Sequence, residues 1–173
     1  GSDVGRRSGA SPEVNGVAHM LEHMAFKGTR RRSARAIAEE IERVGGSLNA
    51  YTSREHTAYY ARILADDVGL AADILADILQ HSTFDPAELE KERHVILQEI
   101  GQVKDTPDDL VFDLLQETSY PDQPMGRAIL GPEQIVAEMP RSALVDYMAR
   151  HYGPKRMVFA GAGKYVNPEI FFG

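Results

Sequence analysis

Residues 16–29 of the chain read GVAHMLEHMAFKGT and contain the pattern His-x-x-Glu-His. In a helix, which turns by about 100° per residue, His19, Glu22 and His23 fall on one face. The opposite side carries the apolar residues Val17, Leu21, Met24 and Ala25. We therefore expect a helix over about 13–27 that buries one face and presents two imidazoles and a carboxylate to a cleft.

This pattern has the chemistry of a metal site. Two histidines one turn apart can hold a zinc ion, and a glutamate beside them can accept a proton from the metal's water. Such a site needs a third protein ligand. The 173 residues include no cysteine, so disulfides and thiolate sites are excluded and the third ligand must be a histidine or a carboxylate.

A later helix, expected over about 85–104, offers the third ligand. Its inward stripe is marked by apolar residues that repeat every seven positions: Leu89, Ile96 and Val103. The positions that would complete this stripe hold Glu92 and Glu99 where a core helix would carry leucine. A buried, unpaired carboxylate is costly, so it usually has a cation or a metal as its partner.

Two simpler explanations compete with a metal site. His-x-x-Glu-His can form a solvated surface face, because the pattern alone is only moderately specific. Glu92 and Glu99 can pair with arginines such as Arg35 or Arg62 in a structural salt bridge. Because both explanations would have to hold at once, we favour the metal site. The other histidines have no such neighbours and are expected to be structural or on the surface: His56, His81, His94 and His151.

Composition and charge narrow the class of protein. A chain of 173 residues suits one domain with a sizeable core, and 43% hydrophobic with 26% charged residues is typical of a soluble globular protein. The net charge of −7 argues against nucleic-acid binding and mildly favours a basic partner. No apolar run approaches the length of a membrane span, and we expect no signal peptide in this sequence.

The remaining patterns predict more helices and a hairpin. Helices are expected in these further segments: 33–44, 66–79, 106–115, 132–138 and 140–151. Residues 47–53 and 56–64 are expected to form a hairpin, and residues 157–160 a late strand. The arginines at 30–32 are expected to lie in a solvated loop without a role. The predicted fold class is α+β, a mostly antiparallel sheet with helices packed on it.

Residues 16–29 resemble the zinc-site signature of the pitrilysin/insulinase family of metallopeptidases, the inverzincins. Three further stretches agree: LNAYTSREHTAYY at 48–60, ERHVILQE at 92–99 and GRAILG at 126–131. The separation of His23 from Glu99 also fits the family. The likeness covers about residues 15–163 and is greatest for the processing-peptidase branch of the family.

The resemblance implies a role for each residue of the motif. His19, His23 and Glu99 would be the ligands of one Zn²⁺ per chain. Glu22 would be the general base, and Glu92 would match the family's supporting carboxylate.

The resemblance also implies how a substrate binds. The strand with Asn49 and Ala50 would bind the backbone of an extended peptide by β-addition. Asp109 and Asp113, four residues apart on a predicted helix, fall where the processing peptidases hold a substrate arginine near the cut. The alternative for these two aspartates is a solvated acidic face.

The function that the resemblance implies is that of a zinc endopeptidase for extended, basic, presequence-like segments. The alternative is a non-catalytic scaffold or peptide-binding subunit of the same fold. Residues 1–173 would form one N-terminal-type peptidase domain, incomplete at both ends, with its zinc site at 19–23 and 92–99. A second homologous half, on the same chain or in a partner subunit, would complete it, and a dimer is possible. The expected compartment is the bacterial cytoplasm or, alternatively, the mitochondrial matrix.

Overall fold

The computed structural model describes residues 15–164. Its helices are α1 (Val17–Ala25), α2 (Ala34–Arg43), α3 (Val68–Gln80), α4 (Pro86–Asp105), α5 (Pro107–Ser119), α6 (Glu133–Glu138) and α7 (Arg141–His151). Short 3-10 turns lie at Ala65–Asp67, Pro124–Gly126 and Pro154–Arg156. Two antiparallel strands, β1 (Ser47–Thr52) and β2 (Thr57–Arg62), form the sheet of the described part. The predicted α+β class is confirmed, with more helix than sheet.

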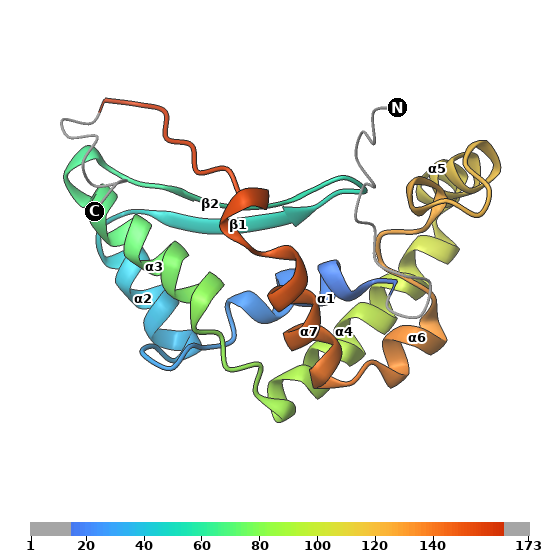
Figure 1. The fold of residues 1–173 in the computed structure, drawn as a ribbon, viewed down its shortest axis with the longest axis horizontal. Coiled ribbons are helices and arrows are strands. Elements are labelled where there is room, and N and C mark those ends of the chain that lie inside the picture. The colour runs from blue at the N-terminus through green and yellow to red at the C-terminus, as the bar shows by residue number, and fades with distance from the viewer. Residues whose placement is uncertain (1–14, 165–173) are drawn as a thin grey trace.

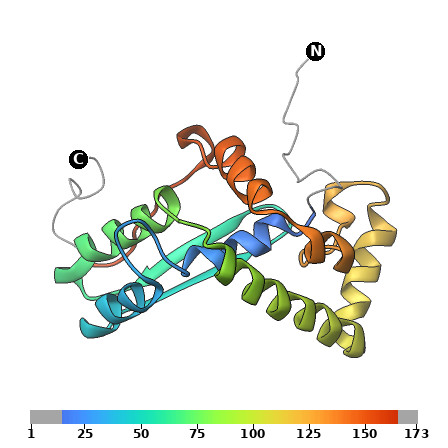
Figure 2. The ribbon, with the colours of Figure 1, turned by 90° about the horizontal axis from the view of Figure 1, so that it is seen from below.

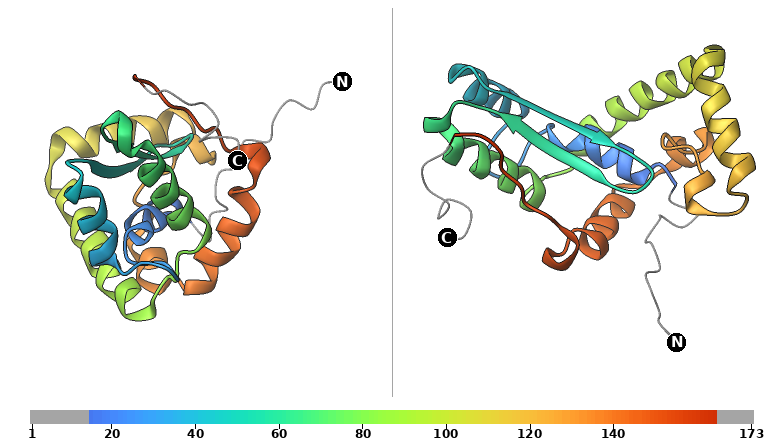
Figure 3. Two further views of the ribbon diagram at one scale, coloured as in Figure 1. Left: turned by 90° about the vertical axis from the view of Figure 1, so that its left-hand side faces the viewer. Right: turned by 90° about the horizontal axis from the view of Figure 1, so that it is seen from above.

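Helix α1 lies in the middle of the molecule, and the left panel of Figure 3 shows it enclosed by the other elements. Its apolar side packs against α4, α6 and α7 in a first core: Val17, Met20, Leu21, Met24, Phe84, Leu89, Ile96, Ile100, Val136, Met139, Ala143 and Leu144. A second core joins α2 and α3 beneath the hairpin: Ile37, Ile41, Ala71, Ile74 and Ile78. The hairpin spans the top of the molecule, with α2 and α3 under one end and α4 to α6 toward the other (Figure 1).

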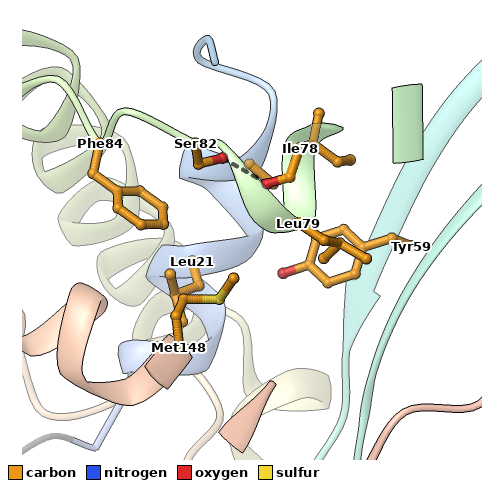
Figure 4. A pocket seen from close by; sticks show the side chains of 8 residues that line it. Leu21, Tyr59, Ile78, Leu79, Ser82, Phe84 and Met148 are labelled. Atoms are coloured by element: carbon orange, nitrogen blue, oxygen red, sulfur yellow. Dashed lines mark hydrogen bonds between the residues drawn. The ribbon is translucent and has the colours of Figure 1, made fainter. Parts of the chain in front are cut away.

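The two cores meet beside α1 without a gap. Figure 4 shows Leu21 near Met148 and Phe84 on one side, and Ile78, Leu79 and Tyr59 on the other. The space among these side chains has no room for a water molecule. Close packing of this kind holds a helix in one position, because any shift would open voids or force clashes. Packing on the apolar side of α1 therefore fixes the position of the opposite side, which carries the histidines.

Local signals that begin helices act as the sequence predicted. The Ser33 hydroxyl accepts a hydrogen bond from the Ala36 amide at the start of α2. The Asp85 carboxylate accepts hydrogen bonds from the amides of Ala87 and Glu88 at the start of α4. Each cap supplies a partner to backbone N–H groups that would otherwise have none, a contribution of about 1 kcal/mol.

The start of α1 depends on glycine instead. Gly16, its N-cap, has a φ of +93°, and Gly131 has a φ of +83°. The backbones of these two glycines cross in close contact. A Cβ on Gly131 would lie 2.5 Å from the Asn15 carbonyl oxygen, and one on Gly16 would lie 2.6 Å from the Leu130 oxygen. The loop ending at Gly131 therefore positions the first turn of the histidine helix.

The hairpin positions β1 over α1. Asn49 pairs with Tyr60 and Ala50 with Tyr59. Its turn contains no glycine. The turn is held instead by the Ser53 hydroxyl, which accepts hydrogen bonds from the amides of Glu55 and His56. In the part of the chain that the structure describes, the outer edge of β1 has no strand beside it.

One predicted strand is absent from the described residues, and the first helix ends earlier than predicted. Residues 157–160 form no strand, and Val158 is 93% exposed. Strand-forming side chains need a neighbouring strand, and none of the described residues provides one here. The first helix ends at Ala25 rather than Lys27, because Phe26 leaves helical geometry before the chain turns at Gly28 (φ +122°). Its expected beginning, residues 13–14, lies outside the described residues.

The arginine run is the third correction, since Arg32 is not solvated. Its guanidinium donates hydrogen bonds to Asp77 and Asp73 of α3, and 10% of the side chain is exposed. The hydroxyl of Thr29 also donates to Asp77, which is fully buried, at 2.7 Å. This network anchors the loop that follows the histidine helix. Asp73 and Asp77 lie more than forty residues from Arg32, and its third acidic partner, Glu40, lies on α2, so the arginines alone gave no sign of the network.

No described helix is both long enough and apolar enough to cross a membrane.

Candidate metal centre

Helices α1 and α4 lie alongside each other, as the view from below in Figure 2 shows, and bring three potential ligands together. One ring nitrogen each of His19 and His23 and one carboxylate oxygen of Glu99 lie within 4.8 Å of one another. Glu99 Oε2 is 3.8 Å from His19 Nε2 and 3.7 Å from His23 Nε2. These distances exceed those of hydrogen bonds, so the three groups face a common point without bonding directly to one another.

His19 is held in its neutral form. Burial, followed by the neighbouring His23, lowers the pKa of His19 to about 4. A neutral imidazole keeps a lone pair for a metal ion. Among the described residues, none provides a hydrogen bond to the buried His19 Nδ1 or to the buried Glu22 Oε2. Both groups therefore have unused bonding capacity beside the ligand cluster.

Glu92, the first of the two glutamates singled out on α4, contacts the ring of His23. Its Oε2 lies 2.9 Å from His23 Nδ1, and its Oε1 lies 2.7 Å from Lys27 Nζ. Burial would raise the pKa of Glu92, but the hydrogen bonds from Lys27 and His23 outweigh it and lower that pKa. The carboxylate is thus ionised at neutral pH. It accepts a hydrogen bond from the Nδ1–H of His23, and the lone pair of Nε2 is then free on the side of Glu99.

The predicted inward stripe on α4 is correct for Glu92 but wrong for Val103, the last residue of the stripe. The buried face consists of Leu89, Glu92, Ile96 and Ile100, while Val103 is half exposed. Glu99 lies at the edge of that face, with 36% of its side chain exposed. A side chain at the edge of a buried face can reach a ligand position and still contact solvent.

A cleft of about 270 Å³ opens beside the cluster. The residues around it come from α1, β1 and α4: Glu22, His23, Phe26, Lys27, Asn49, Ala50 and Glu92. Ala50 is buried and Asn49 is exposed on the outer strand. The cleft therefore joins the proposed base, one proposed ligand and the free strand edge in one place.

The two aspartates of α5 do not line this cleft. Asp113 Oδ1 accepts a hydrogen bond from Arg54 Nη2 of the hairpin turn at 2.6 Å. Asp109 is exposed. The pair is therefore not simply a solvated acidic face, because Asp113 already has a cation as its partner.

The donor set fits zinc. Two imidazoles and one carboxylate are a typical set for a catalytic zinc ion, which keeps its fourth position open. The alternative of a salt bridge from Glu92 to an arginine finds no support, because Glu92 pairs with His23 and Lys27. Arg35 instead pairs with Glu39 on its own helix.

Sequence reasoning missed Lys27 and Arg54. Lys27 lies four residues after His23, so the spacing of one helical turn was a usable signal. Arg54 had no comparable signal, because its partner Asp113 is 59 residues away.

Comparison with known proteins gives consistent matches. The family model described as Insulinase (Peptidase family M16) matches residues 3–133. The mitochondrial-processing peptidase subunit beta of Saccharomyces cerevisiae is 50% identical over 168 residues, which cover 97% of this chain and 36% of that protein. A Bacillus subtilis protein named as the uncharacterized zinc protease YmxG is 48% identical over 160 residues, covering 92% of this chain and 39% of that one.

Solved structures share the fold. A protease from Helicobacter pylori matches with a TM-score of 0.79 at 23% identity, over 83% of this chain and 35% of that one. Pitrilysin matches with a TM-score of 0.71 at 28% identity, over 82% of this chain and 16% of that one. The chain spans about a third of the length of the curated relatives that it matches.

Proposed function

The chain belongs to the insulinase family of metallopeptidases, peptidase family M16, and from that premise we propose that it forms the zinc-binding domain of an endopeptidase for extended peptides. The observation that carries the proposal is the meeting of one nitrogen each of His19 and His23 with one oxygen of Glu99, within 4.8 Å. Neither helix alone supplies this set.

In this proposal, His19, His23 and Glu99 hold one zinc ion, and Glu92 orients His23. A zinc ion bound there would polarise the scissile carbonyl and lower the pKa of the attacking water. Glu22 accepts a proton from that water while the water oxygen bonds to the carbonyl carbon. Glu22 then passes the proton to the leaving nitrogen as the C–N bond breaks.

The position of Glu22 supports its role as the base. It lies between the two histidines on α1 and lines the cleft. Its buried Oε2 has no hydrogen-bond partner among the residues that the structure describes. A carboxylate oxygen without a fixed partner is available to take a proton from water in the cleft.

We propose that the substrate adds as a strand to the outer edge of β1 at Asn49 and Ala50. This edge borders the cleft, and β-addition requires an extended peptide. A basic substrate suits the net charge of −7. An arginine of the substrate would meet Asp109 directly but would have to share Asp113 with Arg54.

The partner and the compartment extend the same proposal. The relatives include proteins named as a beta subunit, so a second homologous half or partner subunit would complete the peptidase. One relative is a mitochondrial protein of Arabidopsis thaliana and another comes from Bacillus subtilis. Both proposed compartments, the mitochondrial matrix and the bacterial cytoplasm, are compatible with these relatives.

The test is replacement of the base. Glu22→Gln should keep one zinc per chain and lower the rate of cleavage of an unstructured, arginine-containing peptide by about a thousandfold. Glu39→Gln, an exposed glutamate on α2, is the matched control and should cleave normally. Product formation is followed by mass spectrometry. An active Glu22→Gln variant would contradict the mechanism. A wild-type chain that binds zinc and peptide without cutting would favour the alternative, a non-catalytic peptide-binding half.

A further inference from the structure

Lys27 is joined to the candidate metal centre through one carboxylate. Its Nζ lies 2.7 Å from Glu92 Oε1, while Glu92 Oε2 lies 2.9 Å from His23 Nδ1. Each oxygen of Glu92 therefore has its own partner. Lys27 follows the last residue of α1, Ala25, by two positions, and its side chain reaches the same carboxylate as that of His23.

Glu92 needs both partners because it is buried. Only 10% of its side chain is exposed. An ionised carboxylate has acceptor oxygens and no donor, and a buried oxygen without a hydrogen bond is unfavourable. His23 satisfies one oxygen only. Lys27 satisfies the other and provides the positive charge that a buried carboxylate requires.

The orientation of Glu92 decides which nitrogen of His23 is free. When Nδ1 carries the proton and its N–H donates a hydrogen bond to Glu92, Nε2 keeps its lone pair. Nε2 is also the atom that lies 3.7 Å from Glu99 Oε2. If Glu92 turned away, the His23 ring would lose the partner that fixes its tautomer and its rotation.

We propose that Lys27 is a positioning residue of the metal centre, which fixes Glu92 and, through Glu92, the ring of His23. The inference rests on the proposed function, because it takes His23 as a zinc ligand. Lys27 acts through Glu92, with which it forms an ion pair at 2.7 Å. Loss of such an outer partner weakens metal binding by about 10- to 100-fold in known sites.

Lys27 also lines the cleft, so a role in peptide binding has to be separated from a role in the metal centre. Zinc affinity measured without any peptide makes that separation. The chain offers a matched control in Lys91, whose Nζ lies 2.6 Å from Glu88 Oε1. That pair also joins a lysine to a glutamate, but the Lys91 side chain is 67% exposed, and neither residue lines the cleft or belongs to the ligand cluster.

The experiment measures the zinc dissociation constant of the full 173-residue chain by competition with a chromophoric chelator. Lys27→Met, which keeps the length of the side chain and removes its charge, should weaken zinc binding about tenfold or more. Lys27→Arg should restore binding to within about threefold, because a guanidinium can donate to the same oxygen. Lys91→Met should bind zinc like the wild type. Ring ¹⁵N signals of the zinc-free chain should report the Nδ1–H tautomer of His23 in the wild type and a mixture in Lys27→Met.

Each outcome decides the inference. Wild-type zinc affinity in Lys27→Met would overturn it and leave the proposed function intact. A loss of affinity that Lys27→Arg fails to restore would trace to packing and would also overturn it. A wild-type chain that binds no zinc would overturn the inference and the proposed function together. Thermal unfolding of the zinc-free variants, compared with Lys91→Met, identifies any general loss of stability.

Discussion

Glu92 and Glu99 lie seven residues apart on the same helix, yet their surroundings give them different chemistry. Glu92 is buried and has hydrogen bonds at both oxygens, from His23 and Lys27. Glu99 is more exposed, and its Oε2 stands 3.7 and 3.8 Å from two imidazole nitrogens. A carboxylate with satisfied oxygens orients its neighbours, whereas one that faces two imidazole nitrogens is suited to share a cation with them.

Asp77 gives a prediction at the residue scale. Burial would raise its pKa, but hydrogen bonds from Thr29, Arg32 and His81 outweigh this and lower it. Asp77→Asn should therefore reduce the free energy of unfolding by about 3 kcal/mol at pH 7. Because the folded pKa lies below the unfolded value, the stabilisation is present above the unfolded pKa and is lost as pH falls. The gap between wild type and variant should narrow below about pH 4.

Urea unfolding across a pH series measures this gap. Asp73→Asn is the control, because Asp73 also pairs with Arg32 but has 41% of its side chain exposed. That variant should lose about 1 kcal/mol or less. An Asp77→Asn chain as stable as Asp73→Asn at pH 7 would contradict the role of the buried network.

At the scale of elements, the position of α1 depends on close backbone contacts as well as on its side chains. The crossing of Gly16 and Gly131 leaves no room for a Cβ on either residue. This crossing fixes the start of α1, and the Thr29–Asp77 network fixes the loop beyond its end. The histidines thus lie on a helix held at both ends.

Gly131→Ala tests this arrangement. A left-handed backbone and a Cβ contact of 2.5 Å should reduce the free energy of unfolding by about 2 kcal/mol or more. Gly69→Ala in α3 is the matched control, because a Cβ there meets nothing within 4 Å. The control should be neutral or stabilising by about 0.5–1 kcal/mol. Chemical denaturation measures both, and equal stabilities would show that the crossing is not tight.

Elements whose signals are local could be predicted from the sequence, and those that depend on distant partners could not. The caps Ser33 and Asp85 act within three residues, so their helices begin where the sequence indicated. The late strand at 157–160 needed a partner strand that the described residues do not provide. Arg32 looked solvated because its acidic partners lie on α2 and α3. Glu92 was found because a carboxylate in an apolar stripe stands out locally.

At the scale of the whole molecule, the candidate site joins two cores. Helix α1 contacts α4 and α7 on one side and β1 on another, so the ligand cluster, the cleft and the strand edge form around one element. Helix α5 differs, since none of its residues is buried and its large apolar side chains are exposed: Val111, Phe112, Leu114 and Leu115. The buried apolar side chains of the described part are therefore concentrated in the two cores and not on α5.

Zinc stoichiometry with and without Glu99 tests the central claim, that α1 and α4 together form one metal site, most directly. Isothermal titration of the zinc-free chain should give one zinc per wild-type chain, with a higher unfolding temperature once zinc is bound. Glu99→Gln, which keeps the size of the side chain, should lose most of this affinity. Glu88→Gln on the same helix should keep it. Zinc binding that is absent from the wild type, or unchanged in Glu99→Gln, would contradict the account.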